Sequence, residues 1–286
     1  MSGAWHSGAP EAAADPLGEK EQRLRARLRG FGSVLVAFSG GVDSAYLACV
    51  ATAELGDRAL CVTADSASYP QRHREIATRI AREFRLNHEF IGTAELANPG
   101  YRANLPDRCY HCKRELFGQL TALARERGVG AVIDGNNADD RGDYRPGRAA
   151  ARELGVQSPL DEVELSKAEI RELSRRAGLP TWDLPASACL SSRIPYHSEV
   201  TGEKLRQIER AEDALHALGF RVFRVRHHGD LARLELGREE MARAIDPEVA
   251  AAIVRDVKGA GYRYVSLDLQ GYRTGSLNEV LHLRPV

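Results

Sequence analysis

Cysteine is scarce in this chain, which has five cysteines among 286 residues. An odd number of cysteines in a large chain does not fit the disulfide framework of a small secreted domain. Structural disulfides are therefore not expected, and each thiol either packs in the core or takes part in chemistry. Since thiols stay reduced in the cytoplasm, we expect a cytoplasmic protein.

Net charge and long apolar runs are also absent. The 40 basic and 40 acidic residues cancel, so the broad basic surface typical of nucleic-acid-binding proteins is not indicated. No apolar run approaches the ~20 residues that a membrane-spanning helix needs. Residues 1–18 lack the basic start and apolar core of a signal peptide, so we expect a disordered leader. We predict neither a membrane nor a nucleic-acid partner.

Two common glycine-rich nucleotide-binding motifs are missing as well. The chain has no G-x-x-x-x-G-K-[ST], and no G-x-G-x-x-G follows its first strand. In their place stands S-V-L-V-A-F-S-G-G-V-D-S at residues 33–44. Residues 34–38 are an apolar run typical of a strand covered on both faces, and a helical pattern begins at Asp43. The stretch therefore predicts a strand that turns through glycines into a helix.

Such a turn can bind phosphate. The backbone N–H groups of a helix N-terminus point at one spot, with the helix dipole behind them. Gly40 and Gly41 have no Cβ atom where an anion must approach, and Ser39 and Ser44 add hydroxyl donors. We predict a phosphate cradle at residues 39–44, with an ordinary glycine turn as the alternative.

Strand and helix patterns alternate over the first two thirds of the chain. This alternation predicts right-handed βαβ units and a parallel sheet. The predicted strands are residues 34–38, 59–64, 88–91 and 131–134, and the predicted helices are residues 19–29, 45–55, 70–85, 113–127 and a last one, to 177, that opens with a capping box of Ser166 and Glu169. We predict an α/β domain over residues 19–183.

The composition shifts at residues 182–197, which have no helical period, and we place a domain boundary there. The patterns that follow predict a helix at residues 201–218, strands at 221–227, 231–236 and 264–269, and a helix that starts with Pro247. We predict a smaller α+β domain over residues 184–286.

A turn-rich stretch, D-G-N-N-A-D-D-R-G-D-Y-R-P-G, follows the predicted strand at residues 131–134. Ligands of open α/β sheets bind at the carboxyl ends of the strands. Asp139, Asp140 and Asp143 are therefore candidates to hold Mg²⁺ or its waters beside phosphates. A solvated polar loop is the alternative.

Cys109 and Cys112 form the sequence C-Y-H-C. Two thiols at this spacing can bind one metal centre or form a redox pair. Zinc, an iron–sulfur cluster, a redox pair and no chemistry all stay open, although the lack of a second C-x-x-C or H-x-x-H disfavours zinc. Lys113 follows at once, and a compact cation at a helix start suits phosphate neutralisation. An exposed surface lysine is the alternative.

Cys189 lies in P-A-S-A-C-L-S-S-R-I-P-Y. Serines flank it, Arg193 follows four residues on, and prolines stiffen both ends. A polar, rigid and cationic loop favours a nucleophilic thiolate over an inert loop cysteine. Cys49 and Cys61 lie among apolar residues of a predicted helix and strand, so we expect both to pack in the core.

Several motifs occur in order along the chain and together resemble the LarE family. They are S-G-G-V-D-S, D-G-N-N-x-D-D-x-x-D-Y-R-P-G, A-C-L-S-S-R-I-P-Y, R-V-R-H-H-G-D-L-A-R-L-E and L-D-L-Q-G-Y-R-T-G-S. The family belongs to the PP-loop ATP pyrophosphatases and provides ATP-dependent sulfur transferases for nickel-pincer nucleotide biosynthesis. Its members convert the carboxylates of pyridinium-3,5-biscarboxylic acid mononucleotide into thiocarboxylates, so the resemblance implies this fold, activity and small-molecule substrate.

The resemblance also implies a site. ATP, with Mg²⁺, would place its phosphates on residues 39–44, with Asp43 and Lys113 as catalytic residues. Some members give up the sulfur of one cysteine, whereas others hold a [4Fe–4S] cluster on three cysteines and accept a sulfide on the open iron. The second type is implied here, with Cys109, Cys112 and Cys189 as ligands. Cys189 as the sulfur source stays open, and a homo-oligomer is expected.

Three arginines are predicted to bind the substrate. Arg224 and Arg226 alternate along one face of a strand, so both can point at one anion, the substrate phosphate, unless that face is a solvated edge. Arg193 is the third. Weaker candidates for the cleft between the domains are Glu212, Asp230, Asp268 and Arg273.

Three other functions stay open. A tRNA-thiolating PP-loop enzyme would need a basic surface, which the balanced charge does not indicate. An amide-forming synthetase that uses ammonia would need no C-x-x-C. A non-catalytic ATP- or cluster-binding scaffold would bind ATP without releasing pyrophosphate.

Overall fold

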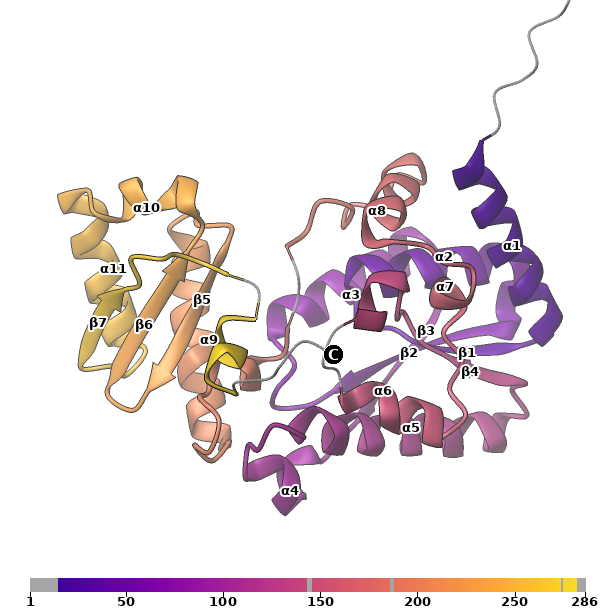
Figure 1. Cartoon of the computed structure of the whole chain (residues 1–286), viewed down its shortest axis with the longest axis horizontal. Coiled ribbons are helices and arrows are strands. Elements are labelled where there is room, and N and C mark those ends of the chain that lie inside the picture. The colour runs from indigo at the N-terminus through magenta and orange to yellow at the C-terminus, as the bar shows by residue number, and fades with distance from the viewer. Residues whose placement is uncertain (1–14, 143–145, 186–187, 274, 282–286) are drawn as a thin grey trace, which may run out of the picture.

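The structure, a computed structural model, describes residues 15–142, 146–185, 188–273 and 275–281. Two β-sheets lie toward opposite ends of its long axis, the larger formed by the N-terminal part of the sequence and the smaller by the C-terminal part (Figure 1). None of the helices in the described ranges is long and apolar enough to cross a bilayer.

The larger sheet has four parallel strands in the order β3-β2-β1-β4. The strands are β1 (Val34–Ala37), β2 (Ala59–Asp65), β3 (Asn87–Gly92) and β4 (Ala131–Ile133). β1 is central, with Val34 opposite Ala59 on one side and Ala131 on the other. The predicted α/β class and parallel sheet are confirmed, and the carboxyl ends of the strands meet at one edge.

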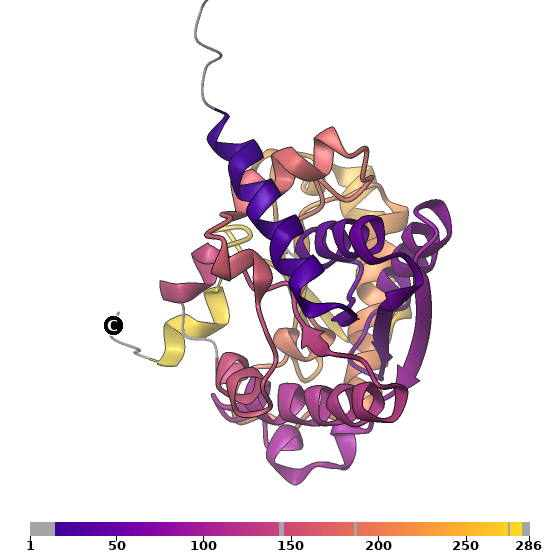
Figure 2. The same cartoon turned by 90° about the vertical axis from the view of Figure 1, so that its right-hand side faces the viewer.

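Helices cover both faces of this sheet (Figures 1 and 2). Val34 and Val36 point into one core and Leu35 into the other, as the period of two in a strand requires. The helices of the first face are α1 (Pro16–Phe31), α2 (Val42–Leu55), α3 (Gln71–Glu83), α7 (Pro159–Glu162) and α8 (Lys167–Arg176). Those of the second are α5 (Arg108–Arg127) and α6 (Pro146–Glu153).

Two helix starts differ from the prediction. α5 begins at Arg108 instead of residue 113, because R-C-Y-H-C-K has no apolar period that marks it as helical. α1 begins at Pro16, a residue suited to the first turn, so residues 16–18 of the predicted leader are helical. Residues 1–14 lie outside the described ranges.

The smaller sheet consists of β5 (Phe223–His228), β6 (Leu231–Leu236) and β7 (Tyr264–Leu267). β5 and β6 are antiparallel, whereas β6 and β7 are parallel. Its helices are α9 (Gly202–Ala217), α10 (Arg238–Ala244), which was not predicted, and α11 (Pro247–Gly259). This α+β part has a core of its own.

Helix α9 connects the two parts of the molecule. Leu205 and Ile208, in its first half, pack with Leu190 and with Tyr101 from α4 (Pro99–Arg102). Its second half packs in the core of the smaller sheet. The segment after residue 189 is thus held between both parts.

Candidate active site

The predicted phosphate cradle forms a closed loop between β1 and α2. The backbone N–H of Ser39 donates a hydrogen bond to the Ser44 hydroxyl (3.2 Å), and the two hydroxyls lie 3.0 Å apart. The Ser44 hydroxyl in turn donates to the carbonyl of Gly41 (3.1 Å). These bonds hold the glycine turn against the first turn of α2, where N–H groups can receive an anion.

Glycine is required at Gly40. Its φ of +71° lies in the left-handed region, and a Cβ atom there would come within 3.2 Å of the backbone of Ala77 on α3. Gly135 also has no room for a side chain, because its Cβ would lie 3.0 Å from the backbone nitrogen of Ser44. The loop therefore packs between α3 and the turn that follows β4.

Asp43 forms an ion pair with Lys167, a residue that the sequence analysis did not identify. Lys167 is the first residue of α8, and its backbone N–H donates to the Asp139 carboxylate (2.9 Å). Burial raises the pKa of the Asp43 carboxyl and Lys167 acts to lower it. Asp43 Oδ1 is buried without a hydrogen-bond partner in the described part of the chain, so it can receive a ligand.

The acidic residues near this loop suit a weakly coordinated cation. The charge of Asp140 raises the pKa of Asp43, so Asp140 lies near Asp43. Its neighbour Asp139 accepts the hydrogen bond from the backbone N–H of Lys167. Within the described ranges, no three His, Cys, Asp or Glu side chains form a group that could hold a metal ion by themselves. Mg²⁺ usually takes only one or two carboxylates and completes its shell with water and phosphate, which these residues allow. Asp143 lies outside the described residues.

Lys113 lies on the second turn of α5. Its Nζ is 5.2 Å from the centre of the Phe117 ring, and its stem lies beside Gly147 of α6. Burial raises the pKa of Asp134 and Lys113 acts to lower it. Since Asp134 precedes the turn that packs on Ser44, Lys113 lies within electrostatic reach of the cradle.

Two thiols lie on the first turns of α5, and the loop at residue 189 carries a third. Cys109 and Cys112 lie one turn apart, and Cys112 packs in the cluster that contains Leu190. Burial and then the charge of Cys189 raise the pKa of both thiols, that of Cys112 to about 12. The third cysteine is therefore close enough to act on the other two. Cys49 and Cys61 are packed in the core of the larger sheet, as predicted.

Hydrogen bonds fix the loop that carries Cys189. The backbone N–H of Leu190 donates to the carbonyl of Ser68 (2.9 Å). Arg108, buried beside the thiols, donates to the carbonyl of Ser191 (2.8 Å). The loop is thus tied both to the segment after β2 and to α5.

Arg193 anchors this loop from the other side. It is only 3% exposed, and it binds the Glu212 carboxylate of α9 with two 2.9 Å bonds. It also donates to the carbonyls of Ala188 (2.7 Å) and Cys189 (2.9 Å). A guanidinium enclosed in this way positions the cysteine. The substrate contact of Arg193 stays a prediction, and Glu212, which was expected to be exposed or to bind a metal, is buried as the partner of Arg193.

Arg226 and Arg224 differ in their surroundings. Arg226 is buried and donates to the Glu235 carboxylate (2.7 Å), the Ser276 hydroxyl (2.8 Å) and the carbonyl of Ser192 (2.8 Å), so it is a further anchor. Arg224 lies over the Tyr272 ring (5.0 Å), and burial and the neighbouring Arg193 lower its pKa. An anion would stabilise the Arg224 charge.

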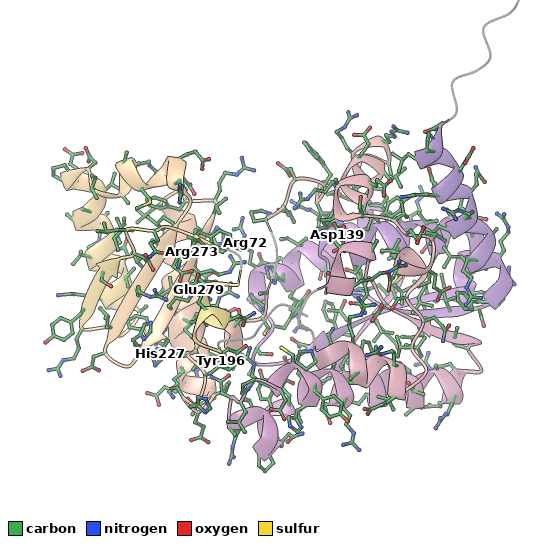
Figure 3. The ribbon with its side chains drawn as sticks, viewed as in Figure 1. Arg72, Asp139, Tyr196, His227, Arg273 and Glu279 are labelled. Atoms are coloured by element: carbon green, nitrogen blue, oxygen red, sulfur yellow. The ribbon has the colours of Figure 1, made fainter. Side chains whose placement is uncertain are left out.

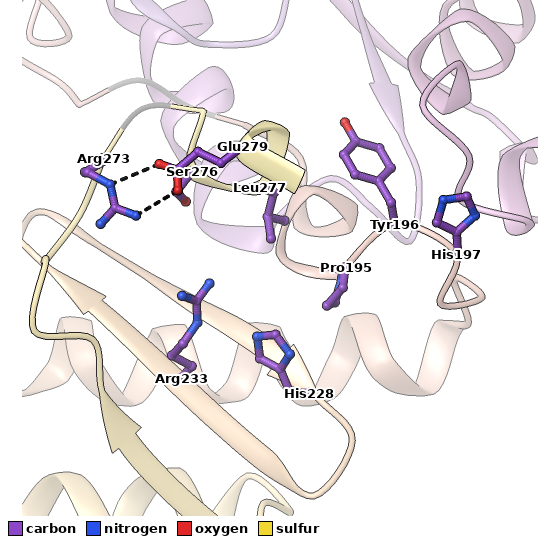
Figure 4. Close-up of a pocket in the computed structure, with 9 residues that line it drawn as sticks. All are labelled: Pro195, Tyr196, His197, His228, Arg233, Arg273, Ser276, Leu277 and Glu279. Atoms are coloured by element: carbon purple, nitrogen blue, oxygen red, sulfur yellow. Dashed lines mark hydrogen bonds and ion pairs between the residues drawn. The ribbon is translucent and has the colours of Figure 1, made fainter. Parts of the chain in front are cut away.

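The weaker candidates Arg273, Asp268 and Asp230 each form an ion pair in the smaller part. Arg273 and Glu279 form an ion pair in the smaller part, whereas Asp139 belongs to the larger one (Figure 3). The pair lines a hollow of about 610 Å³ together with Arg233 and His228 (Figure 4). The remaining two candidates also form ion pairs, Asp268 with Arg233 and Asp230 with Arg263.

Replacing Arg193 with alanine is expected to lower the free energy of unfolding by about 3–5 kcal/mol, because the Glu212 carboxylate stays buried without its cation. Urea denaturation measures the change. The matched control is Arg102→Ala, which removes a surface pair with Glu199 (3.3 Å) and is expected to cost ~0–1 kcal/mol. Equal losses for the two variants would refute the anchoring role.

The pH dependence of the stability that the Arg193–Glu212 pair contributes follows from the direction of the Glu212 pKa shift. Burial acts to raise the pKa of Glu212, but Arg193 and its hydrogen bonds lower it below the ordinary value. A group with a lowered pKa in the folded state contributes stability above its unfolded pKa. This contribution is lost as the pH falls through the folded value.

Comparison with known proteins identifies relatives along most of the chain. The model of the asparagine synthase family matches residues 21–246. The pyridinium-3,5-bisthiocarboxylic acid mononucleotide synthase of Lactiplantibacillus plantarum is 35% identical over 266 residues, which cover 93% of this chain and 96% of the relative. An uncharacterized protein of Synechocystis is 45% identical over 93% of this chain and 99% of its own length. A subunit of the glutamine-hydrolyzing GMP synthase of Methanopyrus kandleri is 28% identical over 58% of this chain and 57% of its own length.

Proposed function

This chain belongs to the PP-loop ATP pyrophosphatases and, within them, to the LarE family, and from this premise we propose that it is an ATP-dependent sulfur transferase of nickel-pincer nucleotide biosynthesis. It adenylates a carboxylate of pyridinium-3,5-biscarboxylic acid mononucleotide and converts it into a thiocarboxylate. The family assigns the use of ATP, and the substrate is inferred from the relative in Lactiplantibacillus plantarum.

The observation that carries the proposal is the presence of two sites in one chain. A glycine-serine cradle for phosphates lies at the carboxyl edge of the larger sheet. The three thiols lie on α5 and on the anchored loop at residue 189, and Lys113 acts electrostatically on Cys112 and on Asp134. Nucleotide activation alone would need the cradle but not the thiols.

The cradle and its cations bind ATP in this proposal. Ser39, Gly40, Gly41 and Ser44 receive the phosphates through N–H and hydroxyl groups. Lys113 and Lys167 neutralise the charge that develops on pyrophosphate as it leaves. Asp43 orients Lys167 and, through its free oxygen, can hold a water of Mg²⁺.

The substrate carboxylate attacks the α phosphorus and pyrophosphate leaves. A carboxylate is unreactive toward sulfur, whereas the acyl-adenylate provides AMP as a leaving group. Arg224 is the residue of the smaller part that we propose for the substrate phosphate, because its environment favours a bound anion. Arg193 and Arg226 hold the loop on which the sulfur chemistry depends.

Cys109, Cys112 and Cys189 are proposed to hold a [4Fe–4S] cluster. Three thiolates would hold the cluster and leave it one open position, as the resemblance implies. The buried Arg108 favours the thiolate form of Cys109. The side chains of the described ranges form no group of three that could hold a metal ion. When bound, the cluster supplies an open iron that can carry a sulfide. We further propose a homo-oligomeric, cytoplasmic protein, as the resemblance implies.

The test supplies ATP, Mg²⁺, the pyridinium mononucleotide and sulfide to the anaerobically purified protein. We expect the thiocarboxylate product by mass spectrometry and a release of pyrophosphate and AMP that requires the pyridinium compound. Iron and acid-labile sulfide analysis of the same preparation tests the cluster. Pyrophosphate release that requires tRNA, or ammonia incorporation into the product, would contradict the proposal.

A further inference from the structure

Two consecutive backbone carbonyls at the entry of the phosphate cradle accept hydrogen bonds from side-chain hydroxyls. The carbonyl of Phe38 accepts one from Thr63 of β2 (2.7 Å), and the carbonyl of Ser39 accepts one from Tyr69 (3.0 Å). Neither hydroxyl has a role in the mechanism above. Because the chain is held at two successive carbonyls, these bonds set the direction of the peptide groups that lead into Gly40.

The geometry of the peptide group converts this restraint into an orientation for N–H groups. A trans peptide is planar, and its C=O and N–H bonds point in opposite directions. The peptide between Phe38 and Ser39 shows the result, because its carbonyl faces Thr63 while its N–H donates to the Ser44 hydroxyl (3.2 Å). A hydroxyl that holds the carbonyl of a peptide therefore also directs the N–H of that peptide.

The next peptide, between Ser39 and Gly40, follows the same rule. Its carbonyl faces the Tyr69 hydroxyl, so the N–H of Gly40 points away from Tyr69. Within the described part of the chain, no group accepts a hydrogen bond from this N–H, which leaves it for an anion. Glycine adopts many backbone conformations at low cost, so the orientation of this peptide depends on a bond from outside the loop.

Tyr69 can supply such a bond because its own segment, between β2 and α3, is fixed. The backbone N–H of Tyr69 donates to the carbonyl of Ser66 (3.0 Å), and the neighbouring Ser68 accepts a bond from Leu190 (2.9 Å). The first N–H of α3 donates to the Glu209 carboxylate of α9 (2.7 Å). Burial raises the pKa of the Tyr69 hydroxyl, so the hydroxyl keeps its proton and stays a donor.

We propose that Tyr69 is a positioning residue of the phosphate cradle, whose hydroxyl holds the Ser39 carbonyl away from the nucleotide and directs the Gly40 N–H toward the phosphates. This inference rests on the proposed function and adds a residue to its first half-reaction. Without the hydroxyl, the peptide also populates an orientation in which its carbonyl faces the anion. Phosphate binding must then reverse that rotation, so the apparent affinity falls with the fraction of protein in the competent orientation.

The experiment uses the anaerobically purified full chain with the substitution Tyr69→Phe, which keeps the ring and removes only the hydroxyl. Calorimetry measures the Kd for inorganic pyrophosphate, and a kinetic assay measures pyrophosphate release in the presence of the pyridinium compound. We expect the Kd for pyrophosphate and the KM for ATP to rise on the order of tenfold, the scale of one hydrogen bond. The kcat should stay within about twofold, because bound phosphates restore the orientation.

The split between KM and kcat separates this role from a structural one, since a loss of folded protein would lower kcat at constant KM. The matched control is Tyr262→Phe, which removes a buried hydroxyl that shares a hydrogen bond with His227 (3.1 Å) in the core of the smaller part. It is expected to leave Kd, KM and kcat within about twofold.

Two results would overturn the role of Tyr69 alone. One is a pyrophosphate affinity of Tyr69→Phe equal to that of the wild type, and the other is a lower kcat at unchanged KM. A wild-type protein that binds pyrophosphate but forms no thiocarboxylate would instead overturn the proposed function.

Discussion

Cys189→Ala is expected to reduce thiocarboxylate formation by on the order of 10³-fold or more, the scale seen when a group that directly takes part in the chemistry is removed. The physical reason is that the anchored loop places this sulfur within electrostatic reach of Cys109 and Cys112, whose pKa it raises. Substrate-dependent pyrophosphate release should persist, because the cradle at residues 39–44 is a separate site. Both rates are measured on the anaerobically purified protein.

The other thiols distinguish the two sulfur sources. If three thiolates hold a cluster, Cys109→Ala and Cys112→Ala should lose activity and iron to the same extent as Cys189→Ala. If Cys189 gives up its own sulfur, only its replacement is decisive, and each protein turns over once. The matched control is Cys49→Ala, the same change at a thiol that packs against the core. Wild-type activity in Cys189→Ala would remove the thiol site from the mechanism.

Lys167→Met is expected to slow pyrophosphate release by about 10²–10³-fold, as for loss of one group that stabilises transition-state charge. The change also leaves Asp43 buried without its cation. Since burial already raises the pKa of Asp43 and Lys167 acts to lower it, the pKa rises further in the variant and Asp43 becomes neutral at higher pH. Thiocarboxylate formation should fall in parallel, because it follows adenylation.

Lys20→Met is the control for Lys167→Met. Lys20 also binds a carboxylate of α8, that of Glu169 (2.8 Å), and donates to the carbonyl of Glu164. Its loss therefore perturbs the same helix without touching the cradle, and we expect activity within about twofold of the wild type and a stability loss of ~1 kcal/mol or less. Equal losses of activity in both variants would mean that Lys167 acts only by holding α8.

Features formed by neighbouring residues could be predicted from the sequence. The strand, the glycine turn and the helix of residues 33–44 are contiguous, so apolar pattern and turn chemistry identify them together. The capping box of Ser166 and Glu169 is equally local and is present. Cys109 and Cys112 were predicted to be chemical from their C-x-x-C spacing, and Cys189 from its polar flanking residues; these roles stay predictions.

Features that depend on distant partners could not be predicted from the sequence. Lys167 and Asp43 are 124 positions apart, and nothing near either residue marks the pair. Arg193 and Arg226 bind carboxylates on α9 and β6, and neither partner could be predicted from the residues around the arginines. Side-chain burial of charged residues is a tertiary property that no local pattern encodes.

The central claim is that a substrate carboxylate is adenylated and then loses an oxygen to sulfur. Pyridinium mononucleotide labelled with ¹⁸O in its carboxylates tests it directly, with mass spectrometry of the released AMP. The account predicts one labelled oxygen in AMP for each thiocarboxylate formed, because the C–O bond breaks on the carbonyl side. Thiocarboxylate formed with unlabelled AMP would contradict it.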